Sequence, residues 1–220
     1  KYDYLLVNLC GFYNPIITLE GYYEYIVKCL LNALKQSPWK RITITGNPDI
    51  LKQCKIKHNL INFTVLKHKQ MLLEIKKADL FLTCPGLNSS LESIMQNTPV
   101  CFLPPQNFSQ ARQLDLFHRA GIAKYYLDWS SITCNNFNFN ESDEEKAIAD
   151  LNNLMILCRN SQSNTEALVE LLRLILNQKP SSIRALKYEQ KQFVVSLNME
   201  SDMTLEQCFN KIFTVNQTSL

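Results

Sequence analysis

The sequence of 220 residues has no run of eighteen apolar residues, no Cys-x-x-Cys pair and no nucleic-acid-binding motif. The first absence excludes a membrane-spanning helix, which needs about 20 predominantly apolar residues. The second leaves no zinc-binding pattern among the eight cysteines, and several of these fall inside predicted strands or helices. We therefore expect free thiols in a reducing compartment, which indicates a cytoplasmic protein.

Charge and composition describe an ordinary globular chain. The net charge is +3, with 46% hydrophobic and 20% charged residues. The basic residues are scattered, so we expect no nucleic acid among the partners. The opening residues DYLLVNL read as a strand, without the cleavage site of a signal peptide. Because the chain starts with Lys1, we expect that upstream sequence was removed or that the chain is a fragment.

Apolar runs alternate with segments of helical periodicity over the first 128 residues. We expect six strands, at residues 3–9, 41–45, 61–66, 79–83, 99–103 and 123–127. The predicted helices between them cover residues 19–34, 48–54, 69–78, 87–96 and 108–120. Without hairpin signals, this alternation predicts an α/β fold with a Rossmann-like, doubly wound parallel sheet.

The pattern changes after residue 128, and the sequence predicts three regions. Residues 1–128 form a Rossmann-like core, residues 129–143 a polar loop, and residues 144–220 a C-terminal helical segment that packs on the core. The predicted helices of this last region cover residues 144–158, 164–177, 181–193 and 204–213.

The stretch 79–110 combines a buried strand, a tight turn, a helix and a second buried strand that ends in a polar loop. Ligands bind at the carboxyl ends of the strands in such folds, and a helix N-terminus there attracts anions. Glu92 lies one turn into this helix. Two simpler interpretations stay open: Asn88 or Ser89 as an N-cap, and a capping box from Ser89 to Glu92.

Residues 83–92, TCPGLNSSLE, resemble the donor-binding signature of GT-B glycosyltransferases, Thr-His-Gly-Gly-x-Asn-Ser-x-x-Glu in the UDP-glucuronosyltransferase-like enzymes. Residues 97–100 and 103–104 match further elements of that family, and Ala78-Asp79 with the Gln-rich loop is similar to the peptidoglycan GlcNAc transferase. The resemblance implies one GT-B half, the one that binds the sugar donor. Cys84-Pro85 replaces the His-Gly of the signature, so the imidazole contact to phosphate is missing.

The resemblance implies two sets of site residues, one for the nucleotide and one for the donor sugar. The nucleotide-binding set is Gly11, Gly46, His68, Met71, Gly86, Asn88, Ser89, Ser90 and Glu92. The sugar-binding set is Gln106, Asn107, Ser109 and Gln110, whose uncharged donors and acceptors suit sugar hydroxyls. A turn exposed to solvent is the alternative for the second set, and a surface histidine the alternative for His68.

The implied function is transfer of a sugar from a nucleoside diphosphate sugar, a UDP-sugar above all, to an acceptor that the sequence does not identify. No cofactor and no metal are implied, because no Asp-x-Asp element is present and a helix terminus can neutralise the diphosphate. The catalytic residues are unknown, since they lie in the N-terminal GT-B half, which would be in cis or on a separate subunit. A nucleotide-sugar hydrolase or epimerase, and a non-catalytic donor-binding subunit, remain as alternatives.

Overall fold

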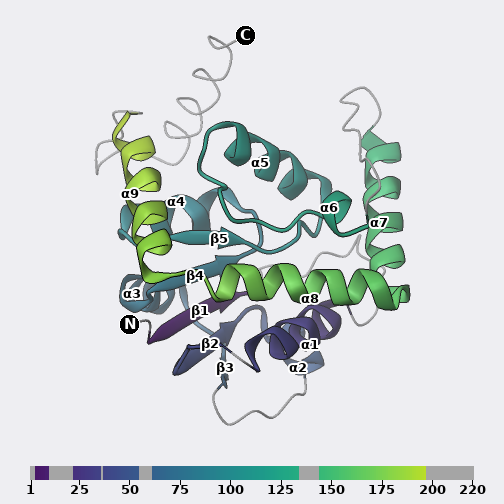
Figure 1. Ribbon diagram of the computed structural model, residues 1–220, viewed down its shortest axis with the longest axis horizontal. Helices are drawn as coiled ribbons and strands as arrows, with labels where there is room; N and C mark the ends of the chain where they lie inside the picture. Colours follow the sequence, from purple (N-terminus) through teal and green to yellow (C-terminus); the bar gives the residue numbers. More distant parts are fainter. Residues whose placement is uncertain (1–2, 10–21, 36, 55–60, 134–143, 197–220) are drawn as a thin grey trace.

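The computed structural model describes residues 3–9, 22–35, 37–54, 61–133 and 144–196. Strands and helices alternate as far as β5, and helices follow (Figure 1). The strands are β1 (Tyr4–Asn8), β2 (Arg41–Thr45), β3 (Ile61–Thr64), β4 (Leu80–Thr83) and β5 (Val100–Phe102). The helices are α1 (Tyr22–Leu34), α2 (Pro48–Gln53), α3 (His68–Lys77), α4 (Leu87–Met95), α5 (Phe108–Arg119), α6 (Trp129–Thr133), α7 (Glu144–Asn160), α8 (Gln162–Leu176) and α9 (Pro180–Ser196).

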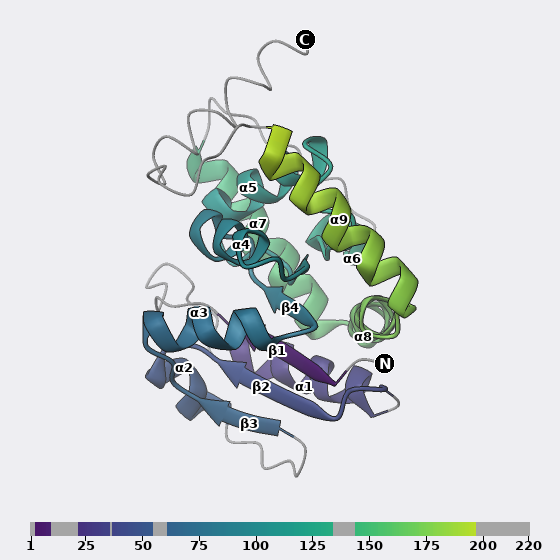
Figure 2. The same cartoon turned by 90° about the vertical axis from the view of Figure 1, so that its left-hand side faces the viewer.

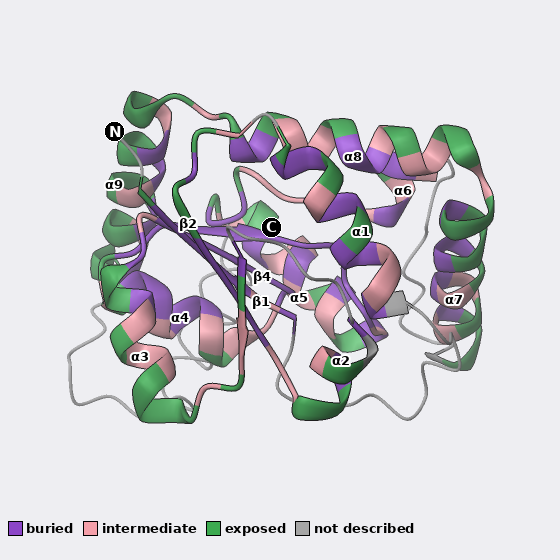
Figure 3. Ribbon diagram, turned by 90° about the horizontal axis from the view of Figure 1, so that it is seen from below, coloured by how far each residue is buried: buried purple, intermediate pink, exposed green. Residues whose placement is uncertain are grey.

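The five strands form one parallel sheet in the order β3-β2-β1-β4-β5. β1, the central strand, and its neighbour β4 are buried almost throughout, because helices cover both faces of the sheet (Figure 3). Their continuous apolar runs are the reason that the sequence predicts them so directly. The predicted α/β fold with a Rossmann-like parallel sheet is confirmed.

The predicted sixth strand at residues 123–127 is wrong, since this segment makes a single parallel bridge between Tyr126 and Phe102. Phe102 N donates to the Tyr125 carbonyl at 3.2 Å, and Leu127 N donates to the Phe102 carbonyl at 3.0 Å. Val100, which precedes Phe102 on the same edge of β5, already has partners for its backbone N–H and carbonyl groups. The side-chain amide of Gln190 in α9 bonds to both Val100 N and Val100 O, at 3.0 and 2.8 Å. The described part of the sheet therefore has five strands.

Two apolar clusters fill the space on either side of the sheet. One packs α1, α2, α7 and α8 against one face, and the other packs α3, α4 and α5 against the opposite face. Figure 2 shows α1 and α4 separated by the strands, and α8 runs beside α1. α9 contributes Ile183 and Leu186 to the first cluster and Val194 to the second.

The region after residue 128 differs from the predicted polar loop, because it begins with the short helix α6. Burial raises the pKa of Asp128, and the opposing effect of hydrogen bonds from backbone groups of Trp129, Ser130 and Ser131, which stabilise this turn, is smaller. The rest of the predicted loop, residues 134–143, and the predicted helix 204–213 lie outside the described residues. None of the described helices combines the length and apolar character needed to cross a membrane.

Candidate functional site

The carboxyl ends of β1 and β4 lie side by side at the centre of the sheet, where the strand order changes direction. Asn8 Nδ2 donates to Thr83 Oγ1 across this boundary at 3.3 Å. Ligands of open α/β sheets bind in the crevice outside the strand ends at such a point. Gly46 is half-buried directly after β2, whereas Gly11 lies outside the described residues. The turn that leads from β4 into α4 is thus at the expected position for a ligand.

α4 begins at Leu87 with Gly86 as its N-cap residue, and no capping side chain accepts a hydrogen bond from the first amide groups of the helix. In contrast, the side chains of Asn107 and Ser161 cap α5 and α8. Asn88 and Ser89 are inside the first turn of α4, and Glu92 lies beyond the third position that a capping box requires. Both simpler interpretations are therefore wrong. An anion can bind the first amide groups of α4, where the helix dipole is positive.

Asn88, Ser89 and Glu92 share one side of α4, because residues three and four apart in a helix are neighbours. Asn88 is exposed, and Ser89 and Glu92 are half-buried. Ser90 lies on the inner side and is fully buried. Its N and Oγ donate to the Gly86 carbonyl at 3.0 and 2.6 Å, so Ser90 supports the turn from within.

The structure brings together two residues that the sequence predicts separately. His68 Nε2 lies 2.8 Å from Glu92 Oε1, although 24 positions separate them. His68 is the first residue of α3, and α3 packs beside α4. Met71, one turn later, is half-buried against the apolar cluster, and its amide donates to the Lys67 carbonyl at 2.8 Å. Of these two predicted residues, His68 is the one placed beside Glu92.

The side chains of the predicted sugar-binding loop are mostly engaged within the protein. Gln106 is 3% exposed, and its Nε2 donates to the Leu9 carbonyl at 3.0 Å and to Cys84 Sγ at 2.9 Å. Asn107 Oδ1 accepts from Gln110 N, and Gln110 Oε1 accepts from Gln106 N, so this pair closes the N-terminus of α5. Ser109 is exposed. Gln106 therefore joins the segments that follow β1, β4 and β5.

Tyr23 of α1 also contacts Gln106, and the sequence did not predict this contact. Its hydroxyl donates to Gln106 Oε1 at 3.4 Å, and the two residues are 83 positions apart. No local pattern distinguishes this tyrosine from the other apolar positions of α1. Its contact follows only from the way in which α1 returns along the sheet.

We expect Gln106→Leu to lower the free energy of unfolding by about 2–3 kcal/mol, since it leaves the Leu9 carbonyl and the Tyr23 hydroxyl buried without this partner. Urea denaturation followed by circular dichroism measures the change. Ser109→Ala, an exposed change in the first turn of α5, is the control and should stay within about 0.5 kcal/mol of wild type. Equal stability of the two variants would contradict the role of Gln106 in joining the segments that follow β1, β4 and β5.

The described cysteines behave as small apolar residues. The thiols of Cys29, Cys54, Cys84, Cys101 and Cys158 are buried and are not in disulfide bonds. Burial raises the pKa of Cys29 and of Cys54 to about 11 and raises that of Cys101 further. These three thiols are therefore protonated at neutral pH. Within the described residues, no group of three or more His, Cys, Asp or Glu side chains is placed to hold a metal ion.

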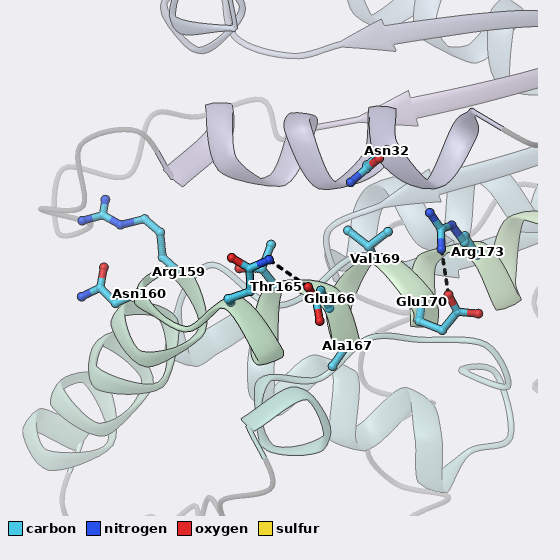
Figure 4. Close-up of a pocket in the computed structure, with 10 residues that line it drawn as sticks. Asn32, Arg159, Asn160, Thr165, Glu166, Ala167, Val169, Glu170 and Arg173 are labelled. Carbon is cyan, nitrogen blue, oxygen red and sulfur yellow. Dashed lines mark hydrogen bonds and ion pairs between the residues drawn. The ribbon is translucent and has the colours of Figure 1, made fainter.

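A pocket of about 790 Å³ lies between α1 and α8 (Figure 4). Its walls include Asn32 of α1 and Arg173 of α8, whose Nη1 is 3.0 Å from Glu170 Oε2. α1 and α8 cover the face of the sheet opposite to α4. This pocket is therefore separate from the turn that carries Gly86 and Glu92.

The fold defines a class, namely the α/β proteins with a Rossmann-like parallel sheet whose ligands bind at the strand ends. No protein-family model matches the sequence. No curated protein is similar to it in sequence.

The structure is similar to solved structures of GT-B glycosyltransferases. Spinosyn rhamnosyltransferase SpnG, complexed with spinosyn aglycone, has 13% identity and a TM-score of 0.42; the match covers 84% of this chain and 45% of SpnG. Phytolacca americana UGT2, complexed with UDP-2fluoro-glucose and pterostilbene, has 13% identity and a TM-score of 0.46; the match covers 98% of this chain and 41% of UGT2. The calicheamicin glycosyltransferase CalG4 has 15% identity and a TM-score of 0.43, over 89% and 44%.

The chain spans less than half the length of each of these proteins. Identities of 13–15% with TM-scores of 0.42–0.46 are too low to define a family or an activity. The function is therefore inferred from the residues at the strand ends.

Proposed function

We propose that this chain is the donor-binding half of a glycosyltransferase and binds the nucleoside diphosphate of a sugar donor, UDP in the first place, at the N-terminus of α4. The observation on which this proposal depends is the start of α4. Gly86 begins the helix beside the centre of the sheet without a side-chain cap, and Glu92 projects from the next turn. The helix end suits a diphosphate, and the carboxylate suits a ribose.

The geometry of α4 matches the order of groups in such a ligand. Glu92 lies five residues after Leu87, which is about 7.5 Å along the helix axis. A nucleoside diphosphate carries its ribose next to its phosphates, so both can lie along one side of the first two turns. The side chain of Glu92 is 23% exposed, which leaves its carboxylate partly shielded from water. A hydrogen bond to a charged group is stronger under that condition.

The rest of the activity follows as part of the same proposal. The amide groups at the start of α4 stabilise the diphosphate leaving group, so no metal is needed for that role. The acceptor pocket and the catalytic base lie in a second half, because the chain is less than half as long as the glycosyltransferases it is similar to. That half is joined to this one in cis or provided by a separate subunit.

Isothermal titration calorimetry with UDP tests the proposal. We expect binding by the wild-type chain and a loss of about 1–2 kcal/mol in Glu92→Ala, the scale of one hydrogen bond to a charged group. Glu166→Ala is the matched control, since Glu166 is an exposed glutamate on α8 and lines the other pocket. Absence of UDP binding by the wild type, or a loss confined to Glu166→Ala, would overturn the assignment.

A further inference from the structure

The contact between His68 and Glu92 joins two helices at the proposed ribose position. His68 Nε2 and Glu92 Oε1 are 2.8 Å apart, the distance of a charge-assisted hydrogen bond. The side chain of His68 is 69% exposed, whereas that of Glu92 is 23% exposed. Only one of the two carboxylate oxygens is used in this contact. The second oxygen can accept from a ligand while the first is held.

Such a contact contributes little to folding. An exposed pair of this kind stabilises a protein by less than the typical hydrogen bond, because solvent screens it and both side chains lose freedom. It has a larger consequence for a ligand that must find Glu92 in one rotamer. A glutamate loses several rotamers when it is fixed, and a protein that has already fixed it binds the ligand more tightly.

We propose that His68 is a positioning residue that holds the Glu92 carboxylate for the ribose hydroxyls and so makes the site selective for ribonucleotides over 2′-deoxyribonucleotides. This inference rests on the proposed function. In this arrangement Nε2–H of His68 donates to Oε1, and the hydroxyl groups of the ribose donate to the carboxylate. The histidine itself does not contact the ligand. Its effect therefore depends on both Glu92 and the ribose hydroxyls.

Calorimetric titrations with UDP and with 2′-deoxyuridine diphosphate measure this dependence. For the wild type we expect UDP to bind about tenfold more tightly than the deoxy compound, since one hydrogen bond to a carboxylate is lost. His68→Ala should weaken UDP binding about fivefold and leave the deoxy compound within about twofold, because an unrestrained Glu92 must be ordered by the ligand. His68→Gln should restore most of the preference, since its Nε2 can replace the imidazole donor.

A double-mutant cycle separates positioning from a general structural effect. In a Glu92→Ala background, His68→Ala should have no further effect on UDP binding, because the two residues act as one unit. His118→Ala is the matched control: this exposed histidine is near the end of α5, and its loss should change neither affinity. Thermal unfolding of His68→Ala should stay close to wild type, as expected for an exposed pair.

The possible outcomes are distinct. Equal weakening of both nucleotides by His68→Ala overturns the positioning role, as does a normal effect of His68→Ala in the Glu92→Ala background. Wild-type binding of UDP without preference over the deoxy compound overturns the inference and leaves the proposed function standing. Binding of neither nucleotide overturns both.

Discussion

Asn88→Asp is expected to weaken UDP binding by about 3 kcal/mol, roughly 100-fold, without loss of stability. Asn88 is the second residue of α4 and is exposed, so the isosteric change adds one negative charge where the diphosphate binds in our proposal. Repulsion between the added charge and one phosphate charge about 5 Å away, at an effective dielectric constant of about 20, costs about 3 kcal/mol. The same charge interacts favourably with the positive end of the helix, by about 0.3–1 kcal/mol.

Asn88→Asp is thus expected to weaken UDP binding without lowering the stability, so a loss of affinity cannot be ascribed to unfolding. Calorimetry gives the affinity for UDP, and urea denaturation gives the free energy of unfolding of the same sample. Asn153→Asp on α7 is the control, since it makes the same chemical change at an exposed position on another helix. Unchanged affinity in Asn88→Asp, or an equal loss in Asn153→Asp, would show that the anion binds elsewhere.

Trp129→Ala is expected to lower the free energy of unfolding by about 3–5 kcal/mol, the range for removal of a large buried aromatic side chain. Trp129 is fully buried in the first apolar cluster, and its Nε1 donates to the Pro105 carbonyl at 2.6 Å. The change leaves a cavity and removes the partner of that carbonyl. The loss is a large part of a typical total stability of about 5–15 kcal/mol.

Urea denaturation measures this loss as a shift of the midpoint. Tyr188→Ala removes an aromatic side chain that is 64% exposed on α9, and we expect it to change stability by less than about 0.5 kcal/mol. If Trp129→Ala changes stability as little as Tyr188→Ala, the segment that follows β5 is not held by its tryptophan.

The parts of the fold that depend on local pattern could be predicted from the sequence. β1 and β4 are continuous apolar runs, and α4 starts after a glycine within a short turn, so the strands, the turn and the position of Glu92 follow from spacing alone. α6 could not be predicted, because five residues are too few to show a helical period. The missing sixth strand also could not, since the amide of Gln190 occupies the β5 edge from 90 residues away.

The candidate site shows the same limit more sharply. Gln106 follows two prolines in a polar loop, which is the pattern of an exposed turn, yet its side chain is buried. Its partner, the Leu9 carbonyl, is 97 residues earlier and becomes a neighbour only when the parallel strands align. The contact between His68 and Glu92 arises in the same way, from the packing of α3 on α4. The residue types in the sequence indicated which groups could bind a ligand, whereas the hydrogen-bond partners of Gln106 and Glu92 depend on the tertiary structure.

The position of α9, which packs against both apolar clusters, affects how the protein unfolds. One end of this helix packs with Ile183 and Leu186 on one side of the sheet, and the other end packs with Val194 on the opposite side. Between them, Gln190 bonds to Val100 and Ile122. A single helix thus packs against both apolar clusters. We therefore expect the two apolar clusters to unfold together in one cooperative transition.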